Sequence, residues 1–284
     1  MYISSFLLLL NVGFTLSILL TRAQLENWIP SYLNATTIDL YVKQIDLIAP
    51  ETFIGLNNLN TLILSFNNLS FTNSSFFTGL NNLETLWLPS NQISFMNDST
   101  FLELNNLKTL TLFDNRLTSL NGTTFKGLHN LENLVLANNL INFINSTTFS
   151  SLLKLNQLHL DKNKLKYIEP FTFINQLNLQ TLYLGINNLT DVKEYAFNGL
   201  ISLDFLDLEQ NQINSIDAQS FSNRLLYLHG INLSNNNLTI VSKSIFAGLS
   251  YLDTVYFGNN PISSLDPNYV LGLCSTNPKC KIYL

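Results

Sequence analysis

The feature that most constrains this chain is a pattern that returns ten times at a spacing of 24 residues, with a single slip to 25. The copy from Leu107 to Asn130 reads L-x-x-L-x-L-x-x-N-x-L-x-x-L-x-x-x-x-F-x-x-L-x-x. A unit of this length cannot bury its apolar face alone, so successive units must stack into a solenoid. A solenoid offers an extended surface rather than an enclosed pocket. The units begin at Ala35, Leu59, Leu83, Leu107, Leu131, Leu155, Leu179, Leu203, Leu228 and Leu252.

Each unit opens with a short alternating stretch that predicts a strand with one buried face. In the third unit, Leu86 and Leu88 are expected to point into the core, with Trp87 pointing outward between them. Ten such strands are expected to form one parallel sheet at a spacing of roughly 4.8 Å. The return segment of each unit is bulkier than the strand, so the stack should curve with the sheet on its inner, concave face.

Two recurring residue types suggest how the turns and the outer side are stabilised. An asparagine follows the strand in every unit but the first, where Lys43 replaces it. Its amide group can both donate and accept, and so can satisfy backbone groups that no strand ladder pairs. A phenylalanine late in each unit is expected to fill the wider outer side, with Val270 in its place in the last unit.

Two units depart from the pattern three residues after the phenylalanine. Gln176 and Arg224 stand where leucine is expected, and each is followed by a leucine, Leu177 or Leu225. We expect that leucine to shift along and fill the gap in the core. The alternative is a functional kink in the solenoid at these units.

The beginning of the chain has the properties of an export signal. Residues 3–20 form an apolar run interrupted by Asn11, and Thr21-Arg22-Ala23 follow. The small residues at positions 21 and 23 suit cleavage after Ala23, which predicts a signal peptide over 1–23 and a secreted chain. The alternative is a retained signal anchor at the cell surface, although the run is barely long enough to span a bilayer. No second apolar run of that length occurs, so no membrane span is predicted after removal of the signal.

Charge and motif content favour a binding protein over an enzyme. The net charge is -5 and no basic stripe occurs, which argues against a nucleic-acid partner. The three histidines, His129, His159 and His229, lie in separate units, and no nucleophile elbow, phosphate loop or zinc-protease motif is present. The two cysteines, Cys274 and Cys280, are expected to pair in an oxidising compartment, with two free thiols as the alternative. The sequence therefore predicts no catalytic residue, no metal and no cofactor.

The repeat resembles that of extracellular leucine-rich repeat proteins of the 24-residue type, such as Toll-like receptor and Slit ectodomains. The resemblance implies an α/β solenoid, a curved horseshoe with a parallel sheet on the concave face and an irregular or short-helical convex side. Residues 29–37 resemble the end of the family's N-terminal cap without its cysteines, and the segment from Asn260-Pro261 onward resembles a reduced C-terminal cap. The expected organisation is a signal peptide (1–23), an N-terminal cap segment (24–34), ten repeats (35–273) and a short C-terminal cap with the cysteine pair (274–284).

The outward strand positions are rich in apolar and aromatic side chains, which commonly mark a contact surface. The alternative is that aromatic residues simply suit strands and cover one another. Ser65 is expected to point outward among them. The predicted ligand-binding residues are Ile63, Phe66, Trp87, Phe113, Val135, His159, Asp161, Tyr183, Phe205 and Asp207.

Nine N-x-S/T sequons support secretion as a glycoprotein, with chance occurrence in an Asn-, Ser- and Thr-rich chain as the alternative. Four of them share one repeat position and would form a column of glycans on the convex side, whereas Asn232 is expected on the concave face. A glycan there would leave the N-terminal half of that face for a ligand. The sequons are Asn34, Asn68, Asn73, Asn97, Asn121, Asn145, Asn188, Asn232 and Asn237.

These observations predict a secreted or cell-surface recognition protein that binds a protein ligand or receptor, in signalling, adhesion or innate immunity. Two alternatives use the same fold: a structural protein of the extracellular matrix, and an inhibitory or regulatory subunit of an enzyme. A fold alone does not decide among them.

Overall fold

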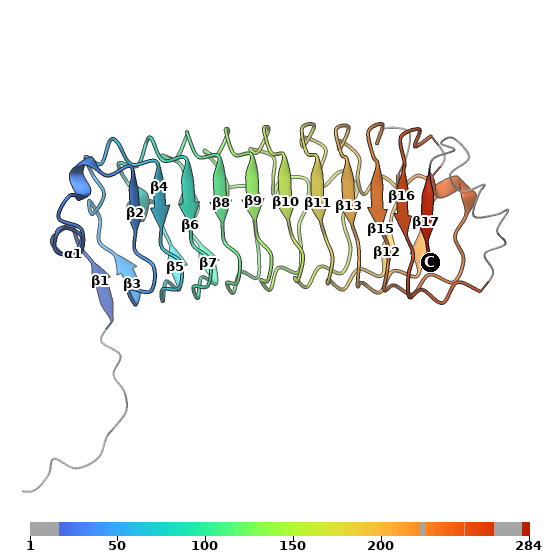
Figure 1. Cartoon of the computed structure of the whole chain (residues 1–284), viewed down its shortest axis with the longest axis horizontal. Coiled ribbons are helices and arrows are strands. Elements are labelled where there is room, and N and C mark those ends of the chain that lie inside the picture. Colours follow the sequence, from blue (N-terminus) through green and yellow to red (C-terminus); the bar gives the residue numbers. More distant parts are fainter. Residues whose placement is uncertain (1–16, 222–224, 247, 264–279) are drawn as a thin grey trace, which may run out of the picture.

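The computed structural model of the chain describes residues 17–221, 225–246, 248–263 and 280–284. Its coils stack into a solenoid, and one long parallel sheet of eleven strands forms one face of the stack (Figure 1). The strands follow one another across the sheet in chain order. They are β2 (Thr37–Asp39), β4 (Thr61–Ile63), β6 (Thr85–Trp87), β8 (Thr109–Thr111), β9 (Asn133–Val135), β10 (Gln157–His159), β11 (Thr181–Tyr183), β13 (Phe205–Asp207), β15 (Gly230–Asn232), β16 (Thr254–Tyr256) and β17 (Lys281–Tyr283).

The sheet has one strand more than the ten that the repeat count predicts. β17 pairs in parallel with β16, with Tyr283 opposite Tyr256. The segment Lys281-Ile282-Tyr283-Leu284 repeats the alternation of a repeat strand, so it can extend the sheet by the same pairing. Within each of the ten strands of this sheet from β2 to β16 the central residue is buried, as predicted.

The return side is mostly turns, with a few short elements. Two pairs of short parallel strands lie there, β5 (Phe71–Thr72) with β7 (Phe95–Met96), and β12 (Asp191–Val192) with β14 (Ser215–Ile216). Two 3-10 helices, η2 (Ser74–Phe77) and η3 (Lys243–Phe246), lie on the same side. This arrangement confirms the predicted irregular and short-helical convex side.

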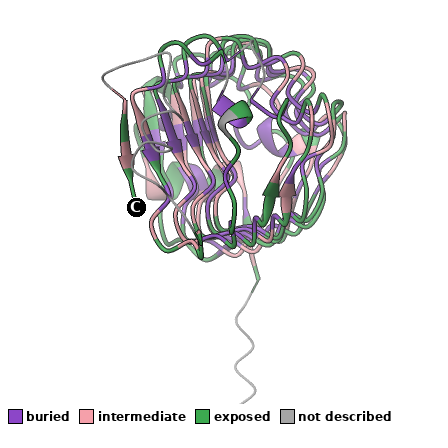
Figure 2. Ribbon diagram, turned by 90° about the vertical axis from the view of Figure 1, so that its right-hand side faces the viewer, coloured by how far each residue is buried: buried purple, intermediate pink, exposed green. Residues whose placement is uncertain are grey.

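A column of phenylalanine rings fills the interior between the sheet and the return side. Phe125, Phe149 and Phe173 stack with ring centroids 6.2 and 6.1 Å apart, and with ring planes within 14° of parallel. In the end-on view of Figure 2 the coils superimpose, and buried positions recur at the same places from coil to coil. The prediction that a phenylalanine of each unit fills this side of the core is confirmed for nine units, while Val270 lies outside the described residues. The column comprises Phe53, Phe77, Phe101, Phe125, Phe149, Phe173, Phe197, Phe221 and Phe246, all buried.

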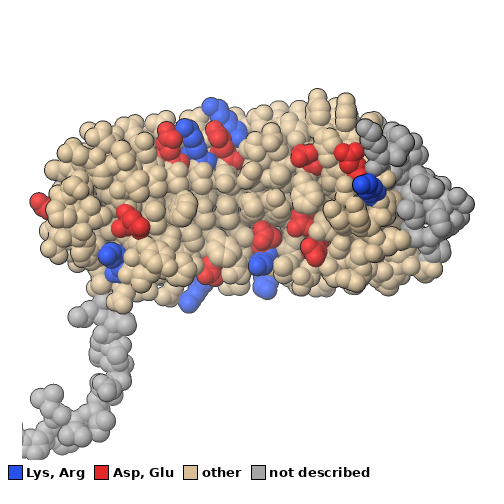
Figure 3. Space-filling view, viewed as in Figure 1, with Lys and Arg blue, Asp and Glu red and all other residues tan. Residues whose placement is uncertain are grey.

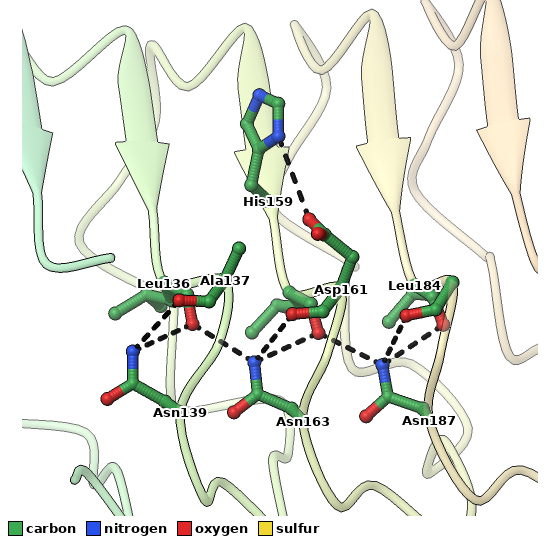
Figure 4. Close-up of polar contacts among 10 residues, drawn as sticks. Leu136, Ala137, Asn139, His159, Asp161, Asn163, Leu184 and Asn187 are labelled. Carbon is green, nitrogen blue, oxygen red and sulfur yellow. Dashed lines mark hydrogen bonds and ion pairs between the residues drawn. The ribbon is translucent and has the colours of Figure 1, made fainter. Parts of the chain in front are cut away.

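The asparagines after the strands form a second column, which joins each coil to the preceding one (Figure 4). Asn163 is representative: its Nδ2 donates to the carbonyl oxygens of Leu160 and Asp161 in its own coil and of Leu136 in the preceding coil, at 3.0 to 3.2 Å. Its Oδ1 accepts from the backbone N–H of Ile141 at 3.0 Å. The predicted role of the amide as both donor and acceptor is therefore confirmed. The column comprises Asn67, Asn91, Asn115, Asn139, Asn163, Asn187, Asn211, Asn236 and Asn260.

The expectation for Gln176 is wrong. Gln176 itself fills the leucine position, only 1% exposed, whereas Leu177 is 47% exposed. Burial is possible because the Gln176 Nε2 donates to the Phe149 carbonyl oxygen of the preceding coil at 2.8 Å, so the polar group is not left unpaired. In the other irregular unit Leu225 is buried as expected, and Arg224 lies outside the described residues.

The N-terminal end of the stack is closed by β1 (Ile18–Leu20), α1 (Arg22–Trp28) and η1 (Tyr32–Asn34). β1 pairs in parallel with β3 (Ile45–Ile48), and Leu20 and Leu25 are fully buried. The first described strand, β1, therefore lies inside the predicted leader 1–23, of which residues 1–16 lie outside the described ones. Within the described ranges, no helix has the length and apolar character needed to cross a bilayer.

At the other end, Cys280 is half-buried against the core, whereas Cys274 lies outside the described residues. Their pairing stays a prediction.

Candidate binding face

The outward side of the eleven-stranded sheet, here the concave face, carries the predicted ligand-binding residues in a few rows. Because the strands are in register, the last residue of one strand lies beside the last residue of the next. Phe205 stands two residues before this row, and Phe66, Phe113 and Asp161 lie just after the strands. The row itself contains Ile63, Trp87, Val135, His159, Tyr183 and Asp207.

The N-terminal half of this face carries an aromatic patch, defined as Tyr41, Phe66, Trp87 and Phe113. Their exposed fractions are 51%, 52%, 44% and 37%. Tyr41 and Phe66 pack with ring centroids 5.1 Å apart. Tyr41 was not among the predicted site residues, although it stands one repeat before Ser65 and so occupies an outward position by register.

The prediction that Ser65 points outward as an exposed residue is wrong, because Ser65 is only 4% exposed. Its carbonyl oxygen accepts from the backbone N–H of Val42 at 3.2 Å, so the turn of the first coil runs beside it. A small side chain at this position is covered by the neighbouring coils, and the equivalent Ala137 is likewise 3% exposed. Large residues at the same position, such as Tyr41 and Phe113, extend beyond the backbone and remain exposed.

The middle of the face carries a stacked ring pair beside a carboxylate. The ring centroids of His159 and Tyr183 lie 4.4 Å apart, with the ring planes at 16°. The His159 Nδ1 is 3.8 Å from the Asp161 Oδ1, as Figure 4 shows. Burial lowers the pKa of His159, and the charge of Asp161 offsets this only in part. A neutral imidazole stacked on a tyrosine is therefore the favoured form near neutral pH.

Beside this pair lies an acidic cluster, defined as Asp161, Asp207 and Glu209. Burial raises the pKa of Asp207, and the negative charges of Glu209 and Asp161 raise it further. Asp207 accepts from the Glu209 N–H at 3.0 Å, and Glu209 accepts from the side-chain amide of Asn232 at 3.1 Å. Figure 3 shows acidic side chains gathered on this face over β10 to β13. The cluster gives the face a locally negative potential next to the ring pair.

The sequon asparagines are all exposed or half-buried. In three of the four that share one repeat position, the asparagine Oδ1 accepts from the backbone N–H two residues on, for example from Thr123 to Asn121 at 2.9 Å. A shallow hollow on the convex side is lined by Asn97, Asp98 and Asn121 among others. Asn232 lies on the concave face, as predicted from its register.

One recurrent structure is absent from the sequence predictions. Asparagines at the ends of successive units donate to backbone carbonyl oxygens of the preceding coil, from Asn82 to Asn57 at 2.8 Å and from Asn106 to Asn81 at 2.9 Å. The Asn-Asn pair repeated at the end of these units is the sequence pattern from which these hydrogen bonds could have been predicted. Among the residues that the structure describes, no three His, Cys, Asp or Glu side chains come together as metal ligands would.

The leucine rich repeat family model matches residues 34–93, 57–117, 82–141, 105–165 and 177–230, which together cover more than half of the chain. No curated protein matches this chain.

Several solved structures are similar. A chain of the TLR13–ssRNA13 complex is 30% identical with a TM-score of 0.75, over 78% of this chain and 32% of that chain. A chain from the octameric complex of Latrophilin 3, Unc5D and FLRT2 (LRR) is 27% identical with a TM-score of 0.71, over 82% of this chain and 78% of that chain. The Leptospira interrogans LRR protein LIC12759 is 27% identical with a TM-score of 0.62, over 85% of this chain and 64% of that chain. This chain thus spans about a third of the TLR13 chain. The repeat, the sheet and the family match together place the chain in the leucine-rich repeat family.

Proposed function

We propose that this chain is an extracellular recognition protein that binds another protein through its concave face. The observation that carries this proposal is the aromatic patch. Trp87 lies in the sheet, and the other three residues lie in the turns that directly follow its strands. The asparagine column fixes these turns, so the surface is rigid before a ligand arrives. Exposed aromatic side chains on a preorganised surface are the residues that contribute most to protein interfaces.

The acidic cluster favours a partner protein that carries positively charged side chains. A cationic side chain placed near Asp207 would relieve the repulsion among the three carboxylates, and the ring pair of His159 and Tyr183 would offer it an aromatic surface. The partner that fits best is therefore a protein with an apolar contact region flanked by lysine or arginine. The net charge of -5 favours such a partner over a nucleic acid.

Glycosylation supports the choice of face. Exposed aromatic residues also occur on the return side, where Phe95 is 56% exposed, but Asn97 lies two residues away and a glycan there would cover this region. In the aromatic patch the sequon Asn68 lies two residues after Phe66, whereas Trp87 and Phe113 have no sequon so near to them in the sequence. Secretion, use of the convex sequons and a Cys274–Cys280 disulfide belong to the same proposal. The similar chain from the octameric complex of Latrophilin 3, Unc5D and FLRT2 supports this proposal, because it is part of an assembly of several proteins.

The test is substitution of the aromatic patch, with a matched aromatic residue on the return side as control. A partner is first identified by affinity capture with the glycosylated, secreted chain and then produced in pure form. We expect Trp87→Ala or Phe113→Ala to weaken its binding about 10- to 100-fold, as loss of a central interface residue of about 1.4–2.8 kcal/mol would. Phe95→Ala should leave the affinity within about twofold. Unchanged affinity in both patch variants would reject the concave face as the binding surface.

A further inference from the structure

The N-terminal segment of the fold contains residues that cleavage after Ala23 would remove. Leu20 is fully buried, and its carbonyl oxygen accepts from the Ala49 N–H at 2.8 Å and from the Thr52 hydroxyl at 3.2 Å. Thr21 caps α1, and Gln24 completes a capping box with it. A chain that began at Gln24 would have neither β1 nor this cap.

Arg22 also contacts residues at this N-terminal end of the solenoid. Its guanidinium donates to the Tyr32 hydroxyl at 3.2 Å and to the Ile54 carbonyl oxygen at 2.5 Å, and lies 5.6 Å from the centre of the Tyr32 ring. These contacts bridge α1 to the first repeat. The segment from Ile18 to Ala23 is thus built into the end of the solenoid, where it covers the first coil.

The pairing of β1 with β3 contains an irregularity that places a carboxylate opposite the first residue of β1. Ile18 pairs with Ile45 and Leu19 pairs with Leu47, so Asp46 is the extra residue of a bulge. The backbone N–H of Ile18 donates to the Asp46 Oδ2 at 2.7 Å. Among the described residues, no lysine, arginine or histidine forms an ion pair with Asp46.

We propose that signal peptidase cleaves between Ser17 and Ile18, and that the new α-ammonium group of Ile18 forms an ion pair with Asp46. Hydrolysis breaks the Ser17 C–N bond, water supplies the hydroxyl of the new Ser17 carboxylic acid and a proton to the Ile18 amine, and the amine takes up a further proton. Thr15 and Ser17 provide the small residues three and one positions before the cut, after an apolar run of suitable length. The nitrogen that already donates to Asp46 thereby gains a positive charge.

This inference depends on the proposed export of the chain, and the first experiment separates the two. The full-length chain is expressed in a secreting eukaryotic cell, and the N-terminus of the product is determined by mass spectrometry and sequencing. We expect secreted protein that begins at Ile18. Secreted protein that begins at Gln24 or elsewhere overturns the processing site but not export, whereas intact protein retained in the cell overturns both.

Two leader variants test the site directly. Ser17→Leu places a large residue before the cut and is expected to abolish cleavage at Ile18. Ala23→Leu is the matched control: Ala23 is exposed on α1, so the variant should keep the same N-terminus as the natural chain. The opposite pattern, with Ala23→Leu altering the N-terminus and Ser17→Leu leaving it unchanged, would contradict the proposal.

The ion pair is tested on the secreted product. Asp46→Asn keeps an acceptor oxygen for Ile18 but removes the charge, and we expect it to lower Tm by about 2–4 °C. Glu26→Gln removes an exposed charge on α1 and should change Tm by less than about 1 °C. In a mature chain with one extra alanine before Ile18, the nitrogen is a neutral amide, and the Asp46→Asn shift should become smaller. An undiminished shift in that chain would overturn the ion pair.

Discussion

At the scale of single residues, the asparagine column makes the strongest prediction. Asn163 is 2% exposed and satisfies four backbone groups, three of them carbonyl oxygens. Asn163→Ala leaves the buried N–H of Ile141 without its partner and removes one of the donors to each of the three carbonyl oxygens, which keep a second donor from Asn139, Asn187 or the Asn138 N–H. We therefore expect a loss of about 2–3 kcal/mol in the free energy of unfolding. Asn142 is exposed, and Asn142→Ala should cost less than about 0.5 kcal/mol. Denaturant titration of both variants measures the difference. Equal losses would show that the column is not a main source of stability.

The acidic cluster gives a pH-dependent prediction at the same scale. Because the pKa of Asp207 is raised in the folded state, the folded chain binds more protons than the unfolded chain just above pH 3.8. The contribution of Asp207 to the free energy of unfolding is therefore most favourable at low pH and is lost as the pH rises through the raised pKa. Asp207→Asn should therefore stabilise the protein at pH 7, by less than about 1 kcal/mol for a half-buried group, and have little effect at pH 3. The measurement is a urea titration at each pH.

Asp39 provides the matched control for Asp207. It occupies the equivalent position in β2 and accepts the same local backbone hydrogen bond, from Tyr41 at 2.9 Å, but it is exposed. Asp39→Asn should change stability little at either pH. A gain equal to that of Asp207→Asn would mean that the effect does not come from burial within the acidic cluster.

At the scale of elements, the turns after the phenylalanine column differ from one coil to the next. Gly199 has a φ of +103°, and an added Cβ would lie 2.6 Å from the Ile174 Cα and closer still to the Phe173 carbonyl oxygen. Gly55 also has a positive φ, +84°, but the nearest atom to an added Cβ is 4.0 Å away. Gly55→Ala should cost about 1 kcal/mol for the backbone conformation alone, and Gly199→Ala about 1–3 kcal/mol more for the clash. Comparison of the two unfolding midpoints checks this order, and similar costs would contradict it.

The elements that repeat could be predicted from the sequence, and the exceptions could not. Strands, asparagines and phenylalanines recur every 24 residues, and each contacts the equivalent residue or backbone of the neighbouring repeat. The repeat spacing in the sequence therefore predicts these contacts. β1 was missed because an apolar run gives the same signal whether it is a leader or a buried strand. Gln176 was missed because its burial depends on one carbonyl oxygen in another coil. The outward rows could be assigned from register, whereas Ser65 shows that exposure also depends on side-chain size.

At the scale of the whole molecule, each strand of the sheet pairs only with its neighbours. Stability should therefore be distributed along the stack as the sum of coils and the interfaces between them. This property also suits the proposed function, because the rows of the concave face keep their spacing as long as the coils between them remain folded. A local defect should then have different consequences at the end of the stack and at its centre.

Two substitutions of similar size test this expectation. Ile38 in β2 and Leu158 in β10 are both fully buried, and each substitution with alanine should cost about 2–5 kcal/mol. Ile38→Ala should speed hydrogen exchange in the first coils while β9, β10 and β11 keep their protection, because the weakened coil has a neighbouring repeat on one side only. Leu158→Ala weakens interfaces on both sides, so protection should fall in β9 and β11 together. Hydrogen exchange followed by mass spectrometry resolves these regions. If both variants lose protection uniformly along the chain, the solenoid unfolds as one cooperative unit and the neighbour-by-neighbour account is wrong.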